Sequence, residues 1–286
     1  MKRIITCAAA IALAAGTAFA SGVADGRYGV WTPVRAKGPV IEKEIYVTSF
    51  DAVAVSGVGK VRWKAGPAPK LVVRTHESLF EHLDCGTDGG RLKLGFRPGV
   101  SVSGLQVLEF DLTSPAFGSL DLSGAADFQA LSPWETDDLD IVVSGSGSVE
   151  AEVAAERARI RLSGSGTVRL AGDLDQLGMD LSGSGAATVR DLDADRVALV
   201  MSGGGEVTLA GKAEALELDL SGSAAVAAKG LEARRVKARL AGAGRVETTA
   251  ADSLEVDASG AASVLYWGTP TVTARTSGSA DIRPGT

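Results

Sequence analysis

The sequence has too few cysteines to be held together by disulfide bonds. It contains two in 286 residues, Cys7 and Cys85. Cys7 lies in a predicted signal peptide, residues 1–20, so the exported chain would keep Cys85 alone. An intramolecular disulfide is then excluded, and stability must come from packing and backbone hydrogen bonds.

The sequence is also poor in aromatics and prolines, and it is not basic. Aromatics make up 5% of the residues, there are nine prolines, and the formal net charge is −6. This charge argues against nucleic acid as a partner, because nucleic-acid-binding proteins carry a basic face. The thirty-six glycines are far fewer than the one third that collagen needs, and they do not fit a helical bundle. The glycine content therefore needs another explanation.

The first twenty residues have the three parts of a secretory signal peptide. Lys2 and Arg3 precede an apolar stretch, residues 4–15, and Ala18-Phe19-Ala20 matches a cleavage site. The apolar stretch is shorter than the roughly 20 residues that a membrane-spanning helix needs. We therefore expect export, with no transmembrane segment in the mature chain.

What the sequence does contain is a serine-glycine pair that recurs about every 19 residues. Successive pairs are 18 to 21 residues apart. They are Ser123-Gly124, Ser144-Gly145, Ser163-Gly164, Ser182-Gly183, Ser202-Gly203, Ser221-Gly222, Ser259-Gly260 and Ser277-Gly278, with Ala241-Gly242 filling the one gap. A fixed period of this length indicates a repeat architecture, in which each unit stacks on the next.

Apolar residues alternate on both sides of each serine. Before Ser182 stand Leu177, Met179 and Leu181, and after it Ala187 occupies a second apolar column. The same positions are apolar in most other repeats, and period-two alternation marks a strand with one buried face. Each repeat is therefore read as strand, Ser-Gly turn, strand and a second turn. A short third side follows, whose expected inward residues are Leu174, Leu192 and Leu231.

The outward positions support stacking in parallel register. Two residues before the serine, Arg161 is followed by Asp180 in the next repeat, and four before it Asp140 is followed by Arg159. In-register stacking would bring opposite charges together on neighbouring strands about 4.8 Å apart. We therefore predict an all-β fold, a single-stranded parallel β-helix of roughly 19-residue coils. Its turn columns suit Ser and Gly, because a larger side chain would strike the coil above or below.

These residues resemble a known family. Leu181-Ser182-Gly183-Ser184-Gly185, the entry segment Phe50–Gly57 and the segments Phe110–Pro115 and Leu120–Gly124 are similar to the auto-transporter adhesin, head GIN domain family. The resemblance covers residues 47–265. It implies a right-handed β-helix, export in Gram-negative bacteria and an adhesive role, and it brings no catalytic residues.

The chain divides into four predicted parts. Residues 1–20 are the signal peptide, 21–46 a loose leader, 47–118 two or three irregular coils that cap the β-helix, and 119–286 the regular coils. The last coil stops soon after Ile282 without an evident cap. Because open β-helix ends expose unpaired backbone, end-to-end contact with a second copy is a hypothesis.

One weak metal site can be drawn from the sequence. His76, His82 and Cys85 are the right residue types for zinc. The two histidines are six residues apart, however, whereas H-E-x-x-H places them four apart. A pair of loop histidines and a partly buried thiol is the favoured reading, so we expect neither a metal nor a cofactor. Acidic turns such as Asp191–Asp195 are likewise read as solvated rather than as calcium ligands.

The serines do not form a catalytic pattern. None lies in G-x-S-x-G, and no histidine follows His82 to act as their base. Ser144, Ser163, Ser182, Ser202 and Ser221 and the glycine after each are therefore predicted to be structural turns. The alternative is a polysaccharide lyase or hydrolase, since long β-helices host such enzymes. Against it, the outward carboxylates alternate with Arg and Lys, and no aromatic occurs between Glu135 and Leu265 to stack on sugars.

The sequence is best interpreted as an exported, non-catalytic binding or structural module of the cell envelope. A surface glycan or a protein is the expected partner, and the irregular N-terminal loops are the favoured contact surface, because loops on a rigid scaffold commonly carry function. A purely structural envelope protein is a third possibility. The periplasm and the outer cell surface both remain open as locations.

Overall fold

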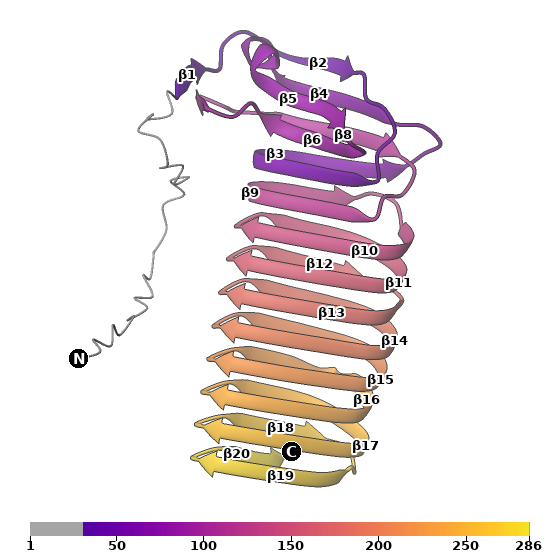
Figure 1. Cartoon of the computed structure of the whole chain (residues 1–286), viewed down its shortest axis with the longest axis vertical. Coiled ribbons are helices and arrows are strands. Elements are labelled where there is room, and N and C mark those ends of the chain that lie inside the picture. The colour runs from indigo at the N-terminus through magenta and orange to yellow at the C-terminus, as the bar shows by residue number, and fades with distance from the viewer. Residues whose placement is uncertain (1–30, 286) are drawn as a thin grey trace, which may run out of the picture.

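The computed structural model describes residues 31–285 and has two parts, a cap and a solenoid (Figure 1). The predicted signal peptide, residues 1–20, and residues 21–30 of the predicted leader lie outside the described residues. The cap elements are β1 Thr32–Arg35, β2 Val40–Ile45, β4 Lys70–His76, the 3-10 helix η1 Glu77–His82, β5 Leu83–Asp88, β6 Arg91–Phe96, β7 Val100–Ser103 and β8 Leu108–Ser114. The first strand of the solenoid is β3 Ala52–Ala65, on which the later coils stack.

The solenoid has about nine turns. Its remaining strands are β9 Ser119–Ala130, β10 Trp134–Gly145, β11 Ser148–Gly164, β12 Thr167–Ala171, β13 Leu174–Gly183, β14 Ala186–Gly203, β15 Glu206–Gly222, β16 Ala225–Gly242, β17 Arg245–Gly260, β18 Ser263–Trp267, β19 Thr271–Gly278 and β20 Asp281–Pro284. The long strands from β9 to β17 pair in parallel with the equivalent strands of the coils before and after them, whereas β19, in the last described coil, pairs on one side with β17. The predicted parallel β-solenoid is confirmed.

The turn serines set the register of the stack. Ser144 pairs with Ser163, Ser163 with Ser182, and Ser182 with Ser202, each across one coil. Identical residues therefore lie above one another, as the spacing predicted. This register keeps every inward position inward, because a shift of one residue would turn a whole strand over.

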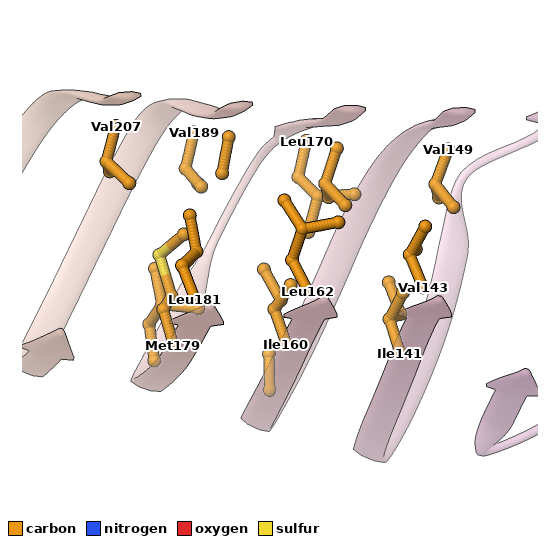
Figure 2. Close-up of a cluster of buried hydrophobic side chains, with 14 of the residues drawn as sticks. Ile141, Val143, Val149, Ile160, Leu162, Leu170, Met179, Leu181, Val189 and Val207 are labelled. Carbon is orange, nitrogen blue, oxygen red and sulfur yellow. The ribbon is translucent and has the colours of Figure 1, made fainter. Parts of the chain in front are cut away.

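The inward side chains form a continuous core between the two long faces (Figure 2). One wall contains Ile141, Ile160 and Met179, which are at most 1% exposed. Val149 and Val168 on the other wall are fully buried. The third side contributes as expected, with Leu174, Leu192 and Leu231 at 0, 3 and 0% exposure. The aliphatic columns thus pack face to face along the solenoid as far as β18, and burial of this apolar surface is the main stabilising term.

Glycine at the turn is required by both conformation and space. Gly164 has φ +106°, and a Cβ placed there would lie 2.5 Å from the carbonyl oxygen of Gly145 in the preceding coil. An L-residue resists this φ, and the short distance is to backbone, which cannot move aside. The glycine content that excluded other folds therefore follows from the stacking of turns.

The cap differs from the irregular coils that were expected over residues 47–118. Only β3 makes a full coil, pairing in parallel with β9 so that Ser56 faces Ser123. Above it, β6 and β8 pair in parallel with β3, whereas β4 is antiparallel to β2 and β8, and β5 is antiparallel to β6. Gly89 and Gly90 join β5 to β6 with φ of +56° and +78°, the signature of a two-residue hairpin turn. Such a turn reverses the chain at once, whereas a parallel coil needs a longer connection.

An aromatic cluster fills the junction between cap and solenoid. Trp63, Phe117, Phe128 and Trp134 lie with ring centroids 4.6–6.3 Å apart and are at most 2% exposed. Both indoles are satisfied, since Trp63 Nε1 donates to Ser114 Oγ (2.9 Å) and Trp134 Nε1 donates to the Phe117 carbonyl (2.8 Å). These four aromatic side chains are therefore core residues.

Candidate functional site

The outer face of the strands before each turn carries a ladder of opposite charges. Arg157 on β11 binds Asp138 on β10 with two hydrogen bonds of 2.5 and 3.0 Å, and Arg161 donates to Asp140 at 2.7 Å. The hydrogen bond from Arg157 lowers the pKa of Asp138 below its ordinary value. These carboxylates are engaged by guanidinium groups of the next coil, which fixes register and leaves them poorly placed for acid-base chemistry.

A second outward column, missed in the sequence, has one sign of charge. Seven residues before the turn serine, five consecutive coils carry an exposed carboxylate. These residues are Asp137, Glu156, Asp175, Asp195 and Glu214. The column ends at Arg234, which forms ion pairs of 3.4 Å with both Glu214 and Asp252. The repeat spacing contained this signal, because the same offset from the serine selects every member.

Shallow grooves follow this acidic column. One of about 700 Å³ runs across five coils between two rows of charged side chains, over a floor of alanines that includes Ala213 and Ala233. Asp193, Lys212 and Glu232 form one row. A second groove of about 470 Å³ continues along the same corner beside Asp137, Glu156 and Asp175. The corner presents a long, solvated and predominantly negative strip, without an enclosed pocket of the kind that holds a small molecule.

The three candidate zinc ligands are not brought together. Among residues 31–285, no group of three His, Cys, Asp or Glu side chains is arranged to hold a metal ion. His76 ends β4 and is buried, with Nδ1 donating to the Gly38 carbonyl (3.1 Å), whereas His82 is the last residue of η1 and lies beside Glu81. Cys85 is in β5, and burial raises the pKa of its thiol to about 11. The helical turn separates the side chains that closeness in sequence had suggested as a site.

Two of the turn serines, Ser221 and Ser259, direct their hydroxyls at backbone carbonyls. Ser221 Oγ donates to the Met201 carbonyl, and Ser259 Oγ donates to the Leu240 carbonyl, each at 3.3 Å. Both acceptors belong to the preceding coil. At these two positions the hydroxyl joins neighbouring coils, a structural use of the kind proposed for the whole column.

The cap carries the most exposed aromatic side chains of the described chain. Tyr46, just after β2, is 87% exposed, and Trp31, just before β1, is 59% exposed. They flank an irregular region whose β1–β7 ribbon lies beside the main stack (Figure 1). Among residues 31–285, Leu131 is the other large apolar side chain that is more than half exposed, at 57%, and it lies on the solenoid beside the first coils. None of the helices in residues 31–285 combines the length and hydropathy needed to cross a bilayer.

Solved structures show the same fold. The structure of a putative adhesin from Parabacteroides distasonis has a TM-score of 0.71 at 21% identity. The match covers 89% of this chain and all of that one. A putative adhesin from Parabacteroides merdae gives 0.69 at 21% identity, with 89 and 99% coverage. A putative lipid binding protein from P. distasonis gives 0.67 at 20% identity, with 89 and 100% coverage. These identities support similarity of fold alone.

The sequence places the chain in a family more directly. No curated protein matches it. The family model described as "Putative auto-transporter adhesin, head GIN domain" matches residues 49–210 and 187–270, which together span most of the chain. The resemblance drawn from the Ser-Gly turns and the entry segment is confirmed, and the chain belongs to this head GIN domain family.

Proposed function

We propose that this protein is an adhesin-like binding module of the cell envelope that acts without catalysis. It is exported through the signal peptide at residues 1–20 and works in the periplasm or on the outer surface of a Gram-negative cell. Its partner is a surface glycan or a protein. Family membership supports the adhesive role, and the pairing of outward carboxylates with arginines in the ladder argues against the polysaccharide-processing alternative.

The cap is the contact surface in this proposal. The observation that carries it is the exposure of Tyr46 and Trp31, at 87 and 59%. Exposed aromatics supply large contact area at low conformational cost and are enriched at interfaces. The solenoid then serves as a rigid stalk of stacked coils, and the loops at its end make contact.

Binding of the purified chain to a glycan array and to intact host cells tests this function. Trp31→Ala with Tyr46→Ala is expected to reduce binding at least tenfold. Leu131→Ala removes a comparably exposed apolar side chain from the solenoid and is the matched control. Equal binding by all three proteins would refute the cap as the contact surface. Turnover of a polysaccharide panel would instead establish an enzyme, and an absence of any binding would favour a purely structural envelope protein.

A further inference from the structure

The two ends of the solenoid differ in how their cores are covered. At the cap end, Val53 of β3 and Leu79 of η1 are fully buried. At the other end, Val272 of β19 is 38% exposed. Ala274 and Thr276, the next inward residues of β19, are also exposed, although their partners on β17, Val256 and Ala258, are 1% exposed. Core positions that are buried throughout the solenoid face solvent in its last described coil.

The backbone of this coil is open as well. Within residues 31–285, β19 pairs on one side with β17, and β20 pairs on one side with β18. The free edge of such a strand presents unpaired N–H and C=O groups that attract another strand. Edges are commonly protected by charge, as on β2 at the cap end, where Glu42, Lys43 and Glu44 follow one another. Arg275 is the single charged residue of β19, whereas β20 carries Asp281 and Arg283, so it is the β19 edge that lacks comparable protection.

We propose that a second copy of this chain covers this end, with the two β19 strands paired antiparallel about a two-fold axis. An isologous contact of this kind uses the same surface on both subunits. The axis stands perpendicular to both the solenoid axis and the strands, so each long face continues into the same face of the partner. The exposed ends of two cores then close against each other. Head-to-tail stacking is blocked, because β4, β5 and η1 cover the opposite end.

Charge narrows the register of this pairing. Inward residues must face inward residues, so one residue of β19 lies on the axis. With Ala274 on the axis, Arg275 faces Thr273 of the other copy, and with Thr273 on the axis it faces Thr271. With Arg275 on the axis, two guanidinium groups oppose each other, and like charges directly opposite are destabilising. The first two registers are therefore favoured.

Sedimentation of the purified full chain over a range of concentrations tests the contact. A monomer–dimer equilibrium is expected, and Val272→Lys should raise the dimer dissociation constant by about 100-fold or more, because two ammonium groups would enter the joined core. The monomer should fold normally, since this side chain already reaches solvent, and circular dichroism checks this. If Val272→Lys does not fold, Thr276→Lys replaces it. Glu42→Lys at the cap end is the control and should leave the equilibrium unchanged. Monomer at every concentration, or a dimer insensitive to the β19 variants, overturns the proposal.

Cross-linking with a short bis-maleimide tests the orientation. Ala274→Cys chains should link to one another, whereas Glu44→Cys chains should not, and a mixture of the two should give no mixed product. A product joining position 274 to position 44 would show head-to-tail stacking and overturn the two-fold arrangement. The contact does not depend on the proposed adhesive function, since loss of glycan or cell binding in the Trp31 and Tyr46 variants leaves the sedimentation result unaffected.

Discussion

Gly183 stacks directly on Gly164, one coil later in the solenoid, and pairs with it across parallel strands. A Cβ on Gly183 would lie 2.6 Å from the Gly164 carbonyl oxygen, and the φ of Gly183 is +109°. The same relation joins Gly164 to Gly145 in the preceding coil. The turn column is therefore a stack of backbone on backbone with no room for a methyl group.

Replacement of this glycine tests that account. Gly183→Ala should destabilise the protein by about 1–3 kcal/mol, because it strains φ and presses a methyl against backbone. Gly204→Ala is the matched control, since its Cβ would meet nothing within 4 Å and its φ is not positive. It should stay within about 0.5 kcal/mol of the parent. Urea denaturation measures both, and equal stabilities would contradict the stacked-turn explanation.

A charge in the inner column should disrupt several coils together. Leu181 is 5% exposed among other aliphatic side chains (Figure 2), and Leu181→Asp would bury a carboxylate without a partner. We expect a loss of more than about 4 kcal/mol, because an unpaired buried charge is among the most destabilising changes. Repeat proteins are stabilised by contacts between neighbouring units, so the loss spreads along the stack. Asp180→Asn on the outer face is the control. A near-native melting curve for Leu181→Asp would refute the inward placement.

The acidic column should repel itself at low ionic strength. Asp195 lies between Asp175 and Glu214 in the five-carboxylate stack, so Asp195→Lys should raise stability by about 0.3–1 kcal/mol. Asp219→Lys is the opposite case, because Asp219 pairs with Arg239 in register and the new charge would face a guanidinium. Thermal melts at low salt should therefore move in opposite directions for the two variants. Both shifts should shrink in about 1 M salt, where charges are screened within about 3 Å. Changes in melting temperature of the same sign for both variants would disprove repulsion within the acidic column as the cause.

The Cys85 thiol should react slowly in the folded protein. Burial raises its pKa from an ordinary value of 9.0 to about 11, so at pH 8 it is almost entirely protonated, and the thiolate is the reactive form. Alkylation by iodoacetamide at pH 8, followed at Cys85 by mass spectrometry, should accelerate strongly in urea.

The raised pKa of Cys85 also determines how the stability of the protein changes with pH. The unfolded chain loses this proton first as pH rises, so stability should fall between about pH 9 and 11. Cys85→Ser should remove that part of the pH dependence. Fast alkylation of the native protein would show that the half-buried thiol is freely accessible.

Most of the solenoid could be read from the sequence because its stacking repeats each signal several times. A single Ser-Gly pair is a common turn, but pairs at a constant spacing predict both the parallel register and the inward columns around Ser182. The acidic column was equally available at a fixed offset from each serine. Its offset of seven residues lies outside the alternating apolar stretch that covers the five residues before each serine. The sequence of the cap contains no repeat. The one local indication of its antiparallel pairing was the Gly89-Gly90 hairpin turn.

The sequence by itself determined which residues lie inside, which residues form the turns and which neighbours each of them contacts. The reason is that in-register stacking converts a linear period into contacts between like positions. It could not determine how His76, His82 and Cys85 are arranged, since η1 and the strand pairings of the cap separate residues that are close along the chain. Nor could it show that Val272 reaches solvent while Leu254, its partner on β17, is buried. That difference depends on whether another coil covers a strand, which only the tertiary structure decides.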